Sequence, residues 1–329
     1  MSDLAEPQAG IATAARLELT DEERAQLHAL AAELAGAPPG LLDDPDWLAL
    51  ARRASCRLPV RILAALRQLR QDAGRAGILS LRELLAEEGA LPDTPTVPDS
   101  VERIPALPST VAMLLGQQLG EVVAYRNEKG GALVQNVVPV RSLADSQSNA
   151  GSVPLELHNE NAFHPHRPDF IGLLCLRGDH DGRAGTVVAS VRDVLPLLGP
   201  ADLAVLGSPR FLTEAPPSFT SGEATSPHPV LGGHPSDPDL RVDFNATTPL
   251  DEEAEAALAR LGEALQATSS SLVLRPGEMV FIDNRLVVHG RTDFTPRYDG
   301  RDRWLHRVYV HLDSRRSGRH RSGRRPLLA

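Results

Sequence analysis

Hydrophobic residues in the first third of the chain recur every three to four positions, a spacing that predicts amphipathic helices. Thr20 and Glu23 have the spacing of a capping box, and leucines and alanines follow at helical intervals as far as Leu34. The proline-rich segment 91–108 then ends the helical pattern and is expected to connect across the domain. Further helices are expected over 46–53, 59–70 and 79–88. Residues 1–108 are therefore predicted to be a helical N-terminal part.

From about residue 120 the pattern changes to short β-branched runs separated by Gly, Pro, Asn and Asp, which predicts a β-sandwich or barrel. The expected strands are 121–125, 133–138, 171–176, 186–190, 271–274, 279–282, 286–288 and 307–312. Between them, the segment 211–238 lacks periodicity and is rich in Pro, Ser, Gly and His. Long loops of this kind are usually functional, and we expect a lid here. Leucines at helical spacing predict an inserted helix over 251–267.

The composition is that of a globular protein, with 42% hydrophobic residues among 329, and we expect one domain over 1–329. A net charge of −9 argues against a nucleic-acid partner, and the arginine-rich segment 315–329 is expected to be a solvated basic tail. The first residues do not resemble a signal peptide, and there is no run of 18 apolar residues. We therefore expect a cytoplasmic protein without a membrane partner.

Candidate metal ligands lie in the segment VPLELHNE, residues 153–160. In an extended chain, residues two apart face the same side, so His158 and Glu160 converge while Asn159 points away. A second segment, Pro276–Arg291, predicts a strand, a tight turn and an apolar strand that ends on His289. His289 could then be a third ligand from a neighbouring strand.

Two histidines and one carboxylate leave three coordination positions open, as an iron(II) oxygenase needs for a bidentate cosubstrate and oxygen. A histidine and a glutamate two residues apart also occur together by chance, and a histidine beside an apolar run is often an ordinary core residue. Arg303, fourteen residues after His289, strengthens the oxygenase hypothesis because a buried guanidinium can bind the distal carboxylate of 2-oxoglutarate. The alternative for Arg303 is a surface ion pair with Asp299 or Asp302. Arg307 lies on the same face of an extended strand as Arg303 and could point into the same pocket.

At these residues the chain resembles the clavaminate synthase-like oxygenases of the taurine dioxygenase superfamily, nearest their asparagine oxygenases and their arginine and lysine hydroxylases. The matching stretches are Glu156–Asp179, Gly185–Ser190 and Pro276–Val310. The resemblance implies an α+β fold in which a double-stranded β-helix, or jelly roll, occupies about 109–314. It implies iron(II) as cofactor, with 2-oxoglutarate and oxygen as cosubstrates.

Position by position, the resemblance implies His158, Glu160 and His289 as iron ligands, with Arg303 and Thr186 binding the far carboxylate of 2-oxoglutarate. The family usually has threonine where this chain has Asn159, but that residue is not a ligand. The implied reaction is hydroxylation of an L-amino acid, expected at the β-carbon, in antibiotic or peptide metabolism, with desaturation and cyclisation as alternatives. The amino acid could be free or tethered to a carrier protein.

Four residues match the substrate contacts of the asparagine oxygenases: Glu128 for the α-amino group, Arg307 for the α-carboxylate, and Asn149 and Asp243 for the remaining polar contacts. Charges of opposite sign at the two ends suit a buried zwitterion. Glu128 could instead be a hairpin residue, Asn149 a turn cap, and Thr186 only a β-branched strand residue. A single acidic residue at 243 favours asparagine or a similar polar amino acid, with lysine, arginine and citrulline as alternatives.

Two other classes of protein remain as alternatives. A non-catalytic jelly-roll binding protein could keep this fold, and a zinc hydrolase could use the same two histidines and glutamate. Neither alternative explains Thr186 and Arg303, and the sequence offers no evident general base for a hydrolase.

Overall fold

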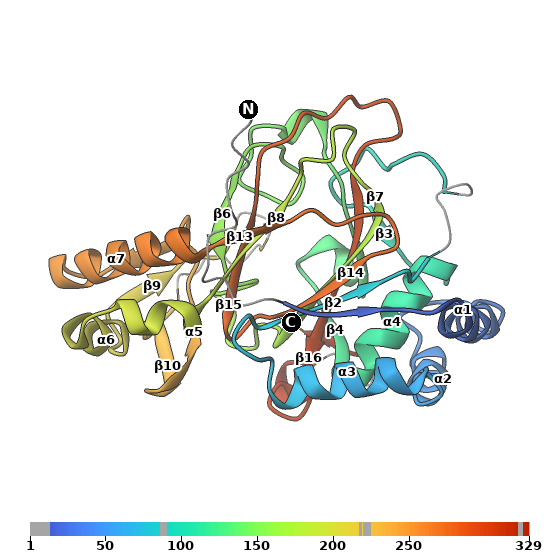
Figure 1. Ribbon diagram of the computed structural model, residues 1–329, viewed down its shortest axis with the longest axis horizontal. Helices are drawn as coiled ribbons and strands as arrows, with labels where there is room; N and C mark the ends of the chain where they lie inside the picture. Colours follow the sequence, from blue (N-terminus) through green and yellow to red (C-terminus); the bar gives the residue numbers. More distant parts are fainter. Residues whose placement is uncertain (1–13, 86–90, 217–218, 220–224, 322–324, 329) are drawn as a thin grey trace, which may run out of the picture.

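The computed structural model describes the whole chain except residues 1–13, 86–90, 217–218, 220–224, 322–324 and 329. Its core is two facing β-sheets, as expected for a jelly roll (Figure 1). The larger sheet has the order β1 (Ala15–Glu18), β2 (Ile78–Arg82), β14 (Met279–Asp283), β7 (Phe170–Arg177), β16 (Trp304–His311), β4 (Glu121–Tyr125) and β17 (Leu327–Leu328), with β5 (Val134–Val137) also on β16 and β3 (Val101–Glu102) on β5. The smaller sheet has the order β13 (Ser270–Leu272), β8 (Thr186–Ser190), β15 (Val287–Arg291) and β6 (Leu155–His158).

Strand β7 shows how the larger sheet joins two layers of core, because its side chains alternate between its faces. Leu174 and Leu176 pack among the residues of helices α1 (Asp21–Ala35), α2 (Pro45–Ser55), α3 (Val60–Gln71) and α4 (Leu107–Leu119). Ile171 and Leu173 pack instead between the sheets, against side chains of the smaller sheet. The helices α5 (Val191–Val194), α6 (Pro200–Leu206) and α7 (Glu252–Thr268) lie beyond the smaller sheet, on the opposite side of the molecule from α1–α4 (Figure 1).

Most of the predicted elements are present within two or three residues of their expected bounds. The capping box at Thr20 and Glu23 forms with both of its hydrogen bonds, and the inserted helix predicted over 251–267 is α7. The expected lid contributes β9 (Phe211–Thr213), which pairs with β12 (Thr247–Pro249), and β10 (Leu231–His234), which pairs with β11 (Asp237–Leu240). In the part of the chain that the structure describes, no helix is both long and apolar enough to cross a membrane.

The structure differs from the sequence-based expectations at three places. Residues 79–88 were predicted to be helical, but Ile78–Arg82 forms β2, because β1 and β14 bind it on both sides and this pairing outweighs its helical spacing. Residues 86–88 of that expected helix lie outside the described residues. The helix α4 was not predicted, since it is buried nearly all round and shows little amphipathic pattern. The C-terminal segment is not simply a solvated tail: Arg321 pairs with Glu121, and β17 adds to the larger sheet beside β4.

Candidate metal centre and ligand cavity

His158 and His289 lie on neighbouring strands of the smaller sheet. They are direct partners in the antiparallel register of β6 and β15, and their ring centroids are 4.4 Å apart. Residues that face each other in this way project from the same face of a sheet, which explains why two positions 131 residues apart converge. The Nδ1 atom of His158 donates to the carbonyl of Glu156 at 2.8 Å, so its Nε2 is left as the lone-pair donor to a metal.

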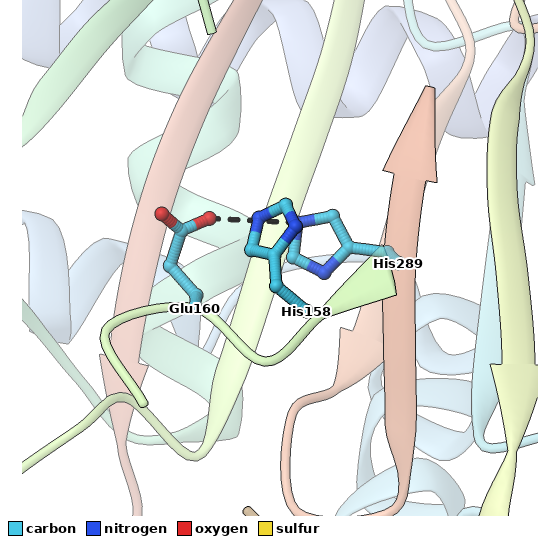
Figure 2. Close-up of side chains that lie close together, drawn as sticks. All are labelled: His158, Glu160 and His289. Atoms are coloured by element: carbon cyan, nitrogen blue, oxygen red, sulfur yellow. Dashed lines mark ion pairs between the residues drawn. The ribbon is translucent and has the colours of Figure 1, made fainter. Parts of the chain in front are cut away.

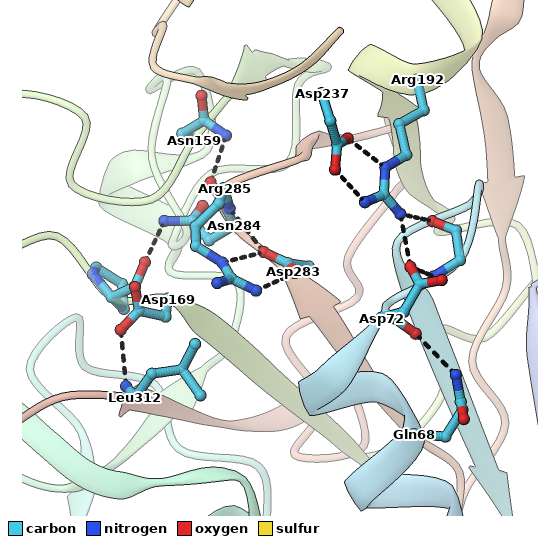
Figure 3. Close-up of polar contacts among 12 residues, drawn as sticks. Gln68, Asp72, Asn159, Asp169, Arg192, Asp237, Asp283, Asn284, Arg285 and Leu312 are labelled. Carbon is cyan, nitrogen blue, oxygen red and sulfur yellow. Dashed lines mark hydrogen bonds and ion pairs between the residues drawn. The ribbon is translucent and has the colours of Figure 1, made fainter. Parts of the chain in front are cut away.

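Glu160 follows β6 and brings its carboxylate to the two imidazoles (Figure 2). Its Oε2 lies 3.5 Å from Nε2 of His289. The side chain of Asn284 fixes this turn, accepting a bond from the amide of Glu160 at 2.8 Å and donating to its carbonyl at 3.1 Å. Asn159 points the other way, as predicted, and donates to the carbonyls of Asn284 and Val287 (Figure 3 shows the bond to Asn284).

The charges at this centre favour metal binding. Burial alone would raise the pKa of Glu160, but Arg307 and the two histidines outweigh it and hold that pKa well below its usual range. Burial, together with nearby His158, lowers the pKa of His289. The carboxylate is thus ionised and the imidazole neutral at neutral pH, the states in which both groups bind metals.

The donor atoms of His158, Glu160 and His289 all lie within 4.8 Å of one another. Neutral imidazole nitrogens and one carboxylate oxygen make a donor set that suits iron(II), and these three side chains leave the other coordination positions free. The residues therefore fit the metal that the sequence predicts.

A cavity of about 190 Å³ opens beside these three side chains. It is smaller than the ~300–1,000 Å³ pockets that take drug-sized ligands, and therefore suits small metabolites. Every site residue predicted from the sequence lines it: Glu128, Asn149, His158, Glu160, Thr186, Asp243, His289, Arg303 and Arg307.

Arg303 and Thr186 are both buried at the wall of this cavity. Burial lowers the pKa of Arg303, and among the residues that the structure describes no carboxylate lies within ion-pair distance of it. The acidic residues suggested as surface partners are engaged elsewhere. Asp299 faces His180 at 3.2 Å, and Asp302 accepts the backbone amides of Arg297 and Tyr298. A buried guanidinium facing a cavity in this way favours an anionic ligand.

Glu128 and Arg307, predicted for opposite ends of an amino acid, are paired with each other. One nitrogen of Arg307 donates to Glu128 Oε1, and another donates to Glu160 Oε1 at 2.8 Å. Gln135 also accepts from this guanidinium. The buried guanidinium is therefore shared by two buried carboxylates, one of which belongs to the candidate metal ligand Glu160.

The other two predicted substrate contacts lie elsewhere around the cavity and are partly buried. Asp243 lines the cavity and forms an isolated backbone bridge with His158, one of the candidate metal ligands. Its Oδ1 accepts the backbone amide of Asn245 at 2.9 Å. Asn149 lies in the loop between η2 (Arg141–Leu143) and β6.

Sequence reasoning missed three residues of this site. Arg291 lines the cavity and ties β15 to the loop of Asn149, donating to the carbonyls of Ser148 at 3.3 Å and Val153 at 2.9 Å. Tyr309 contacts both buried glutamates, at 2.8 and 2.9 Å. Arg291 and Tyr309 each follow a predicted site residue by two positions on its own strand, so the alternation of strand side chains could have identified them. Gln135 carried no such signal.

Comparison with known proteins places the chain in a family. Residues 106–309 match the model of the family described as "Taurine catabolism dioxygenase TauD, TfdA family". The L-asparagine oxygenase of Streptomyces coelicolor is 48% identical over 92% of this chain and 92% of its own length. Clavaminate synthase 2 of Streptomyces clavuligerus is 35% identical, covering 88% of this chain and 90% of its own.

Solved structures agree. An asparagine oxygenase in complex with Fe(II), 2S,3S-3-hydroxyasparagine and succinate has a TM-score of 0.92 and 46% identity, covering 95% of this chain and 98% of its own. The non-heme iron oxygenase OrfP, in complex with Fe and alpha-ketoglutaric acid, has a TM-score of 0.86 and 32% identity over 95% of this chain and 100% of its own.

These similarities confirm the predicted resemblance to the clavaminate synthase-like oxygenases. They also confirm the predicted enzyme class, a dioxygenase that uses iron(II), 2-oxoglutarate and oxygen. The chain belongs to the taurine catabolism dioxygenase TauD, TfdA family.

Proposed function

We propose that this enzyme hydroxylates the β-carbon of a free L-amino acid, and that L-asparagine is its preferred substrate. Amino acid hydroxylation is the kind of reaction to which its relatives point, since a 46% identical asparagine oxygenase was solved with 3-hydroxyasparagine. The observation that carries the proposal is the burial of Glu128 and Arg307 in one cavity with Glu160 and His289. A zwitterion needs both of its ends paired when it leaves water, and these two side chains offer the matching charges.

The position of Asp243 supports a polar side chain on the substrate. Its backbone is bridged to that of His158, and it lines the same cavity as Glu128 and Arg307. An amino acid bound at both places would hold its β-carbon between them, next to the metal. A single carboxylate can accept the amide N–H of asparagine, and the neighbouring Asn245 adds no second charge. Lysine and arginine are the alternatives, because the same carboxylate could pair with a cation.

For the metal and cosubstrate, we propose His158, Glu160 and His289 as the ligands of iron(II). Arg303 and Thr186 would bind the distal carboxylate of 2-oxoglutarate, which would give the buried guanidinium an anionic partner. Iron(II) with 2-oxoglutarate and oxygen supplies the oxidising chemistry. The chain would hold 2-oxoglutarate and the amino acid beside the iron and limit the access of water to them. A zinc hydrolase or a non-catalytic binding protein would not account for Arg303.

The segment 211–238 is proposed as the lid of this site. Pro216 and Phe219 line the cavity, and the ring of Phe219 lies 4.6 Å from that of Phe163, another lining residue. Similarity to clavaminate synthase 2 is consistent with a role in specialised metabolism, and we propose a cytoplasmic location. A substrate tethered to a carrier protein is the alternative to a free amino acid.

A substrate screen tests the proposal. The purified enzyme, with iron(II), ascorbate and 2-oxoglutarate, is incubated with each standard amino acid, citrulline and ornithine. Succinate is quantified, and mass spectrometry records any gain of one oxygen atom. We expect the largest yield of hydroxylated product with L-asparagine, and none from the His289→Ala variant. A higher yield with lysine or arginine would identify that amino acid, in place of asparagine, as the preferred substrate. Succinate formation that no amino acid stimulates would overturn the proposal.

A further inference from the structure

The hydroxyl group of Tyr309 lies between two buried carboxylates. It is 2.8 Å from Oε1 of Glu128 and 2.9 Å from Oε1 of Glu160, and the tyrosine is 1% exposed. A tyrosine hydroxyl is protonated at neutral pH and can act as a donor to either carboxylate. A phenol has only one hydrogen to donate. It can therefore make a full hydrogen bond to Glu128 or to Glu160, but not to both at once.

The contact with Glu160 involves one particular oxygen. Arg307 also donates to Oε1 of Glu160, at 2.8 Å, whereas Oε2 faces His289. Arg307 thus holds Oε1, and Tyr309 adds a second donor whenever its hydrogen points to Glu160 rather than to Glu128, so Oε2 is the oxygen left for a metal. If Glu160 holds iron(II), a carboxylate restrained in this way would offer one oxygen to the metal and leave the remaining coordination positions open for ligands.

We propose that Tyr309 is a positioning residue that links the amino acid site to the metal centre. The inference rests on the proposed function, in which Glu128 receives the ammonium group of the substrate. An ammonium group brings up to three N–H donors to Glu128 and displaces the tyrosine from it. The single hydroxyl hydrogen of Tyr309 then goes to Glu160 and strengthens the hold on its Oε1. Binding of the amino acid thereby restrains the carboxylate of Glu160 more firmly in its orientation toward the metal site.

A link through Tyr309 predicts that the binding of L-asparagine and the binding of iron(II) are thermodynamically coupled. This coupling can be measured without turnover. If L-asparagine raises the affinity for iron(II), then iron(II) must raise the affinity for L-asparagine by the same factor. The test is anaerobic titration of the protein with iron(II), with and without saturating L-asparagine, in the wild type and in Tyr309→Phe. This variant removes only the hydroxyl group and keeps the buried ring.

Tyr125→Phe is the matched control. Tyr125 is also fully buried, its ring lies 5.7 Å from that of Tyr309, and its hydroxyl donates to the carbonyl of His166 at 2.7 Å. The Tyr125→Phe variant therefore loses a comparable hydrogen bond in the same part of the core. Thermal unfolding of both variants shows whether the fold is retained.

We expect L-asparagine to tighten iron(II) binding by about fivefold or more in the wild type and in Tyr125→Phe. In Tyr309→Phe this factor should fall to within about twofold of one. An unchanged factor in Tyr309→Phe would overturn the inference, and so would a wild type that binds both ligands without coupling. A wild type that binds and hydroxylates no amino acid would overturn the proposed function, and the inference with it.

Discussion

His158 and His289 face each other as register partners on adjacent strands, so the positions of both rings depend on one strand pairing. If they hold iron(II), His158→Ala and His289→Ala should each reduce 2-oxoglutarate turnover to background while the fold is retained. Succinate assays with circular dichroism check both points. His180→Ala, which removes an imidazole outside the cavity, is the control and should remain active. Activity that persists in both variants would contradict the ligand assignment.

Arg303→Ala should weaken 2-oxoglutarate binding by about 10- to 100-fold, because charge-assisted hydrogen bonds to the distal carboxylate are lost. Arg303→Lys should recover only part of this, since lysine lacks the planar fork. Isothermal titration with 2-oxoglutarate measures the effect. Arg297→Ala removes an exposed guanidinium from the same loop and should bind normally. Normal 2-oxoglutarate binding by Arg303→Ala would show that Arg303 does not bind the distal carboxylate of 2-oxoglutarate.

Asp243→Ala should reduce kcat/KM for L-asparagine by about 10- to 100-fold while 2-oxoglutarate is still consumed, because only the side-chain contact is lost. Asp243→Asn keeps an oxygen acceptor and should retain more activity with asparagine. If the substrate is instead lysine or arginine, the two variants should be equally impaired, since both lack the charge. Parallel assays of succinate and of hydroxylated product distinguish these cases. An equal loss of succinate and of hydroxylated product would mean that Asp243 has a structural role.

Asn284→Ala should destabilise the fold by about 1–3 kcal/mol for each buried backbone group that it leaves without a partner. Its amide group bonds to both backbone polar groups of Glu160 and to the carbonyl of Pro168, which fixes the turn that carries the carboxylate of Glu160. Chemical unfolding and iron(II) titration should both show the loss. Gln68→Ala, an exposed amide with one long bond to Asp72, should change neither. Iron(II) affinity equal to that of the wild type would mean that Glu160 is positioned by other contacts.

The sequence was informative wherever local pattern and tertiary structure agree. Strand alternation correctly brought His158 and Glu160 together and turned Asn159 away, because β6 is extended up to the site. The capping box at Thr20 is likewise a local feature and was predicted correctly. Strand β2 was wrongly predicted as a helix, because its conformation depends on β1 and β14, which lie far away in the sequence.

The site residues that the sequence did not reveal are those whose importance depends on contacts between distant strands. Tyr309 contacts Glu128 and Glu160 across more than a hundred residues of chain. Arg307 was predicted to face a substrate carboxylate, yet in the structure its charge is balanced by the same two glutamates. A pattern along one strand can indicate which way a side chain points. It cannot indicate what that side chain meets on the next strand.

Oxygenation of the amino acid at its β-carbon is tested most directly with L-asparagine deuterated at both β-positions. The enzyme is supplied with iron(II), 2-oxoglutarate and oxygen, and the product is analysed by mass spectrometry and NMR. We expect a product that gains one oxygen atom and loses one deuterium, with one succinate formed for each product molecule. Recovery of L-asparagine with both deuterium atoms in place, or of a product hydroxylated elsewhere, would contradict oxygenation at the β-carbon.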